Sequence, residues 1–77
     1  MTLDLRGLSY SDSFKQVKEA IALSCPGKDE VVAFIDAHEH EKCTLLKGFS
    51  ELLLDCKTNL EESNGMYLLK IMPSCAH

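Results

Sequence analysis

The spacing of apolar residues changes within the first part of the chain. Leu3 and Leu5 alternate with polar neighbours, which predicts a short, half-buried strand ending at Gly7. Further on, apolar residues recur at three- and four-residue steps, which predicts a helix over about residues 12–24. The apolar face of this helix comprises Phe14, Val17, Ala20 and Ile21.

Polar residues mark the expected ends of this helix. Ser13 followed by Gln16 fits a capping box, with Ser11 and Asp12 as alternative N-caps. Pro26-Gly27 is expected to stop the helix, because proline cannot continue it and glycine favours its C-terminal turn.

The middle of the chain predicts a strand followed by a second helix. The continuous apolar run over residues 31–35 is typical of a central strand buried on both faces or nearly so. Helical spacing then predicts a helix over about residues 39–54, despite Gly48 within it. Its apolar stripe comprises Cys43, Leu45, Leu46, Phe49, Leu52 and Leu53.

The last part of the chain predicts a β-hairpin. Residues 56–62 and 66–72 have strand character, and Asn64-Gly65 between them supplies the positive φ angles of a type I′ turn. The predicted order is β-α-β-α-β-β. Right-handed crossovers would lay both helices on one face of a four-stranded mixed sheet, an α/β (α+β) two-layer sandwich.

Length and charge narrow the function. The 77 residues predict a single domain over residues 1–72 and a flexible tail over residues 73–77. A net charge of -4 argues against nucleic-acid binding, since affinity for phosphates comes mostly from Lys and Arg. An RNA-binding module stays an alternative, because small β-α-β-α-β-β sandwiches also occur among RNA-binding modules.

Hydropathy and cysteine content predict the compartment. No stretch approaches the roughly 18 apolar residues that span a bilayer, and the first residues lack the apolar core of a secretory signal. We therefore expect a cytoplasmic protein without membrane insertion. Thiols are reduced there, so the four cysteines at positions 25, 43, 56 and 75 are not interpreted as a disulfide framework.

The opening motif Leu3-Asp4-Leu5-Arg6-Gly7-Leu8-Ser9 resembles the TusA/SirA-like family of small sulfur-carrier proteins. The resemblance extends over nearly the whole chain through the element order, Lys15, Lys18, Ala20 and Pro26-Gly27. It implies a sulfur-carrier fold in which the motif leads into Cys-Pro-x-Pro, whose cysteine holds a persulfide at the start of the first helix.

Tyr10-Ser11-Asp12-Ser13 stands where the resemblance implies that cysteine motif. A helix N-terminus lowers a thiol pKa, but a phenol with a pKa near 10 cannot exchange sulfane sulfur. We therefore expect a degenerate site with no catalytic residue and no cofactor.

The other cysteines offer limited substitutes. Leu23-Ser24-Cys25-Pro26 resembles the family's Leu-Ser-Cys-Pro, but it falls at the expected C-terminus of the first helix. A helix C-terminus disfavours a thiolate, so Cys25 is a poor nucleophile. Cys43 and Cys56 are predicted to be small packing residues. Cys75 lies near the end of the chain beside His77, so a persulfide relay through Cys75 remains an alternative.

Residues 36–43 hold the densest set of potential metal ligands. On a continuous helix, Asp36, His40 and Cys43 could share a wall, which would make a weak, open site. The simpler interpretation is that the acids favour the helix start and the histidines face solvent. Glu61-Glu62 is not expected to act as a carboxylate pair, because adjacent strand residues face opposite sides.

These observations favour a non-catalytic protein-interaction module linked to sulfur or redox metabolism, with a protein as its partner. An independent enzyme is the least favoured class, since no nucleophile and base lie at a suitable spacing.

Overall fold

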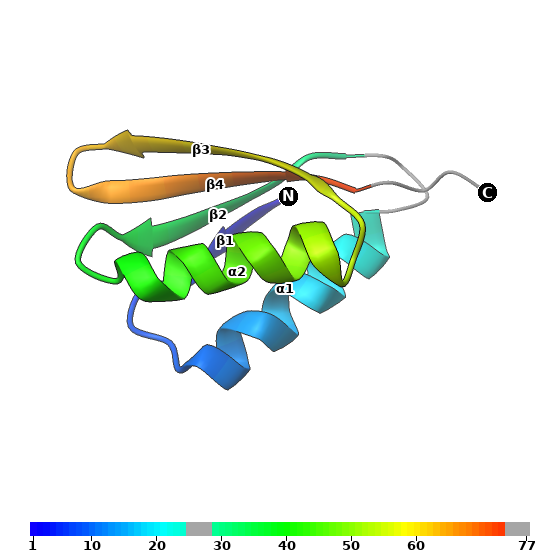
Figure 1. Cartoon of the computed structure of the whole chain (residues 1–77), viewed down its shortest axis with the longest axis horizontal. Coiled ribbons are helices and arrows are strands. Elements are labelled where there is room, and N and C mark those ends of the chain that lie inside the picture. Colours follow the sequence, from blue (N-terminus) through cyan, green and yellow to red (C-terminus); the bar gives the residue numbers. More distant parts are fainter. Residues whose placement is uncertain (25–28, 74–77) are drawn as a thin grey trace.

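Four strands form one mixed sheet, and both helices cover the same face of it (Figure 1). The computed structural model describes residues 1–24 and 29–73. The predicted order and fold class are confirmed. The elements are β1 (Thr2–Asp4), α1 (Tyr10–Ser24), β2 (Val31–Asp36), α2 (His40–Leu52), β3 (Lys57–Ser63) and β4 (Met66–Met72).

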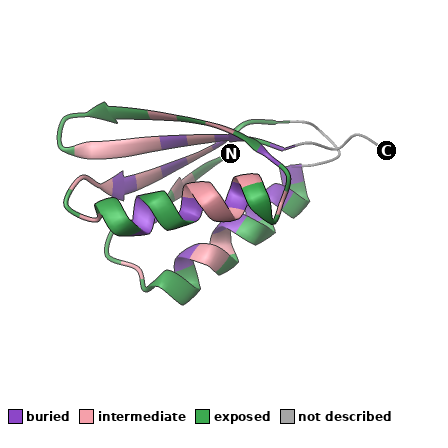
Figure 2. Cartoon of the chain, in the orientation of Figure 1, coloured by how far each residue is buried: buried purple, intermediate pink, exposed green. Residues whose placement is uncertain are grey.

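The strand order in the sheet is β1-β2-β4-β3. β1 is parallel to β2, and β4 is antiparallel to both β2 and β3. Alternate residues of the two central strands, β2 and β4, are buried, and Figure 2 colours them purple. Because alternate side chains of a strand share one face, these residues face the helices. These inward residues are Val31, Ala33, Ile35, Leu69 and Ile71.

β2 is fully buried on the face toward the helices and half-buried on the other, so the prediction of a strand buried on both faces or nearly so overstates the burial of the outer face. Its burial alternates strictly, with Val32 and Phe34 half-buried on the face away from the helices. The neighbouring strands β1 and β4 flank both residues. Phe34 lies opposite Asp4 in β1 and Leu68 in β4.

Most predicted boundaries lie close to the observed ones. β1 ends at Asp4 rather than Gly7, although the Leu5 N–H still donates to the Phe34 carbonyl at 2.9 Å. Gly7 has a φ of +77°, a left-handed conformation that turns the chain toward α1. At the hairpin, Asn64 and Gly65 have φ angles of 53° and 75°, which confirms the positive values required by a type I′ turn.

Within the described ranges, no helix is long and apolar enough to cross a bilayer. The predicted stop at Pro26-Gly27 lies outside the described residues. So does the predicted tail beyond Pro73, whose own side chain is buried.

Candidate functional site

The first turn of α1 holds the four residues at the expected carrier position. Ser9 caps this helix, because its Oγ accepts the N–H of Asp12 at 3.1 Å, and its carbonyl accepts the N–H of Ser13 at 3.0 Å. The predicted capping box at Ser13 and Gln16 is therefore wrong. The helix begins at Tyr10, earlier than predicted, and Ser13 is fully buried one turn inside it.

This turn offers no sulfur chemistry of its own. Tyr10 is 43% exposed and presents a phenol, while Ser11 and Asp12 are exposed. Helix N-termini stabilise negative charge, and the Asp12 carboxylate already supplies it. None of these groups forms and releases a disulfide-like bond to sulfur.

Cys43 and Cys56 are both buried, and neither presents a reactive thiol to solvent. Burial raises the pKa of the Cys43 thiol, which disfavours the nucleophilic thiolate. The Sγ of Cys56 lies 3.5 Å from the carbonyl of Leu54. Cys25 and Cys75 lie outside the described residues, so sulfur transfer through Cys75 stays a prediction.

The structure does not gather the predicted metal ligands Asp36, His40 and Cys43. Asp36 ends β2 instead of belonging to α2, so helical spacing does not relate it to the other two. The Cys43 side chain is in the core, and the His40 Nδ1 lies 3.0 Å from the Tyr67 Oη.

A different trio comes together in the turn before α2. Ligand atoms of Asp36, His38 and Glu39 lie within 4.8 Å of one another. One cation already serves this trio, because Lys42 pairs with Glu39. The Arg6 guanidinium pairs with Asp4. A metal ion would be opposed by the Lys42 charge, so Glu39 is interpreted as part of an internal ion network.

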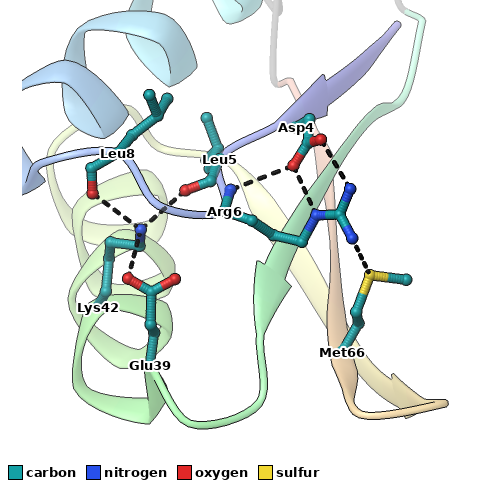
Figure 3. Close-up of polar contacts among 7 residues, drawn as sticks. All are labelled: Asp4, Leu5, Arg6, Leu8, Glu39, Lys42 and Met66. Atoms are coloured by element: carbon teal, nitrogen blue, oxygen red, sulfur yellow. Dashed lines mark hydrogen bonds and ion pairs between the residues drawn. The ribbon is translucent and has the colours of Figure 1, made fainter.

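Lys42 is the centre of that network, and it is 1% exposed (Figure 3). Its Nζ donates to the carbonyls of Leu5 at 2.8 Å and Leu8 at 3.1 Å, and lies 2.9 Å from the Glu39 Oε2. The amine therefore ties the segment between β1 and α1 to the first turn of α2. Sequence reasoning missed this role, although Lys42 precedes Leu46 by one turn on the buried face of the predicted helix.

A second ion pair, between Arg6 and Asp4, lies at the end of β1 and is also drawn in Figure 3. Arg6 contacts both carboxylate oxygens of Asp4 at 2.8 and 2.9 Å, and its Nη1 lies 3.5 Å from the Met66 sulfur (Figure 3). The hydrogen bond from the Arg6 side chain is the main reason that the pKa of Asp4 is lowered to about 2. Both side chains are exposed, so this pair orients the surface and adds little stability.

An apolar groove lies between α1 and α2 on the side away from the sheet. The rings of Phe14 and Phe49 meet with their centroids 5.0 Å apart. The groove has a volume of about 520 Å³ and is open to solvent. It is lined by Phe14, Thr44, Leu45, Gly48, Phe49, Leu52 and Leu53.

Three leucines of the apolar stripe that predicts the second helix line the groove and are exposed. Leu52 and Leu53 are 83% and 72% exposed, and Leu45 is 42% exposed. The sheet covers only the side of α2 that carries Cys43 and Leu46. The apolar stripe is therefore wider than the surface available to bury it.

Comparison with known protein families, with curated proteins and with solved structures gives no match for this chain.

Proposed function

We propose that this protein is a non-catalytic interaction module that docks another protein through the α1–α2 groove. The observation that carries the proposal is the exposed apolar lining of that groove. Soluble chains bury large leucine side chains where they can, and contiguous exposed apolar patches mark interaction surfaces. Phe14 and Phe49 give the groove a firm aromatic floor.

The open face of the sheet is a weaker candidate surface. Its apolar residues Val32, Phe34 and Leu68 are half-buried, and the ion pair of Lys70 with Glu61 lies beside them on β4 and β3. That pair of charges is thus neutralised within the chain. The residues that line the groove carry no charge and have no such internal partner.

The proposed link to sulfur or redox metabolism comes from the resemblance to the TusA/SirA-like family. Carriers of that family work by protein contact, so a docking surface could persist after the cysteine is lost. Tyr10, at the former carrier position, precedes Phe14 by one helical turn. A partner seated in the groove would therefore lie next to the position where such a carrier presents sulfur.

Site-specific photocrosslinking in the native cells tests the proposal. A photoreactive phenylalanine analogue at Leu52 probes the groove, and the same analogue at Leu23 is the matched control. Leu23 is 73% exposed, but it lies on the other flank of α1, near Met1 and Leu3.

We expect a discrete protein adduct from Leu52 and not from Leu23. If the two positions give the same adducts, or none, docking through the groove is refuted. Mass spectrometry of the adduct then tests the metabolic link. A partner with a persulfide-handling or redox-active cysteine supports the link, whereas a partner without one removes the link and leaves docking intact.

A further inference from the structure

Gly48 lies in the middle of α2, where nothing in the described chain requires a glycine. A Cβ built at this position would meet no heavy atom within 4 Å other than those of its chain neighbours and its own helix backbone. Glycine costs a helix interior about 0.5–1 kcal/mol relative to alanine. No other part of the described chain packs against Gly48. Close approach of a partner's backbone would be a physical reason for a residue without a side chain at this position.

The groove walls favour one kind of secondary structure in that partner. Both walls are helices, whose interior backbone N–H and C=O groups are already bonded within each helix. An extended segment would therefore lose backbone hydrogen bonds to water without replacing them. A helix brings its own backbone bonds and packs as a ridge into a groove between two others.

The α1 rim of the groove is basic. At about 100° per residue, Lys18 lies about 40° and Lys15 about 100° around the helix from Phe14. Both are exposed, and no ion pair joins either to an acid within the residues described. The acids of α1, Asp12 and Glu19, lie farther around, at about 160° and 140° from Phe14.

We infer that the groove receives an amphipathic α-helix of another protein, with acidic side chains along the edge that faces Lys15 and Lys18. Its apolar face covers Leu45, Leu52 and the aromatic floor, and its backbone approaches α2 at Gly48. This inference rests on the proposed docking function and specifies the chemistry of the partner.

A display library of amphipathic helices, each of about 16 residues or roughly 24 Å, provides the probe. Apolar residues occupy one face, and Asp, Glu, Lys or Arg are randomised along both edges. Selection uses the full chain, and fluorescence anisotropy then measures binding of the enriched peptide. We expect Asp and Glu to be enriched along one edge only.

Three variants separate the contributions to peptide binding. Gly48→Met should weaken binding at least about tenfold by filling the approach, and it should fold normally because its Cβ has open space. Lys15→Glu with Lys18→Glu should also weaken it at least about tenfold, by like-charge repulsion. Lys57→Glu, on the exposed edge strand β3, is the charge control and should change affinity less than about twofold.

Three results would overturn the inference: no acidic enrichment, binding that Gly48→Met leaves unchanged, or light scattering that shows a dimer dissociated by Gly48→Met. The last would make a second copy of this chain the occupant. An adduct at Leu52 without acidic enrichment would leave docking standing and remove only the acidic helix. The absence of a Leu52 adduct would instead refute the docking function.

Discussion

Replacing Lys42 by methionine tests the network that holds the segment before α1. Methionine keeps the unbranched stem and most of the volume, so the core around the side chain stays filled. The change removes the ammonium that lies within hydrogen-bond distance of Leu5, Leu8 and Glu39. We expect a folded but much less stable protein.

The magnitude follows from the groups that lose their partner. Leu5 keeps a second donor, because its carbonyl also accepts the Leu8 N–H at 3.3 Å. Within the described residues, the Leu8 carbonyl has no substitute donor, and the Glu39 carboxylate keeps only the uncharged Gly7 N–H. Removing one partner of a buried ion pair costs about 3–5 kcal/mol, and the 21% exposure of the Glu39 side chain favours the lower end.

Urea unfolding followed by circular dichroism measures this loss. A loss of about 3 kcal/mol corresponds to a decrease in Tm of roughly 12–24 °C for a domain of this size. Lys47→Met is the matched control on the same helix. Lys47 is 38% exposed and pairs with Glu51 one turn away, so its replacement should cost no more than about 0.5 kcal/mol.

The pH dependence gives a second readout of the same network. The hydrogen bond from Lys42 is the main reason that the pKa of Glu39 is lowered, with the Gly7 N–H and the charge of His38 adding to it. An unfolded glutamate has a pKa of about 4.3, so the pair stabilises the fold above that pH. This stability is lost as the pH falls through the lower pKa of Glu39 in the folded protein. The difference in free energy of unfolding between wild type and Lys42→Met should therefore become smaller over the same pH range.

Equal stability losses in Lys42→Met and Lys47→Met would refute this account, as would a difference that stays constant down to pH 3. The double variant Lys42→Met with Glu39→Gln removes the uncompensated charge. It should regain at least about 1 kcal/mol relative to Lys42→Met alone.

Three further predictions concern individual buried or strained residues. Ser13 and Ser50 are both fully buried, but of these two hydroxyls only that of Ser50 donates a hydrogen bond, to the Leu46 carbonyl at 2.9 Å. Ser13→Ala should therefore stabilise the fold by about 1 kcal/mol in urea unfolding, and Ser50→Ala should not. Cys43 should react with iodoacetamide, followed by mass spectrometry, only after urea unfolds the protein. Gly65→Ala should cost about 1–2 kcal/mol in thermal unfolding, because the φ of +75° disfavours a side chain.

The fold could be predicted because its signals are local. Apolar residues that recur every two positions locate the strands, and those that recur every three to four positions locate the helices. Asn64-Gly65 locates the hairpin, because a type I′ turn needs residues that adopt positive φ angles. The cap of α1 was placed wrongly because several polar residues in succession each satisfy the same chemical pattern. Only the geometry selects Ser9 and leaves Ser13 in the core.

The candidate site was less predictable because it depends on which surfaces meet. An apolar stripe indicates a helix, but not how much of that stripe the sheet can cover. Leu46 and Leu52 belong to the same sequence pattern, yet Leu46 is fully buried and Leu52 is almost fully exposed. Lys42 likewise looks like a surface charge in the sequence, and only the carbonyls of a distant segment explain its burial.

The network and the groove are parts of one arrangement around the start of α1. Lys42 holds the chain that leads into this helix, and Ser9 sets where its first turn begins. The Phe14 ring then reaches Phe49 one turn later and forms the groove floor. Loss of the Lys42 anchor should therefore weaken binding in the groove and lower stability, whereas Gly48→Met should weaken binding with no loss of stability. If Lys42→Met lowers both peptide affinity and stability while Gly48→Met lowers only peptide affinity, the contacts that position α1 are distinguished from the contacts that bind the partner.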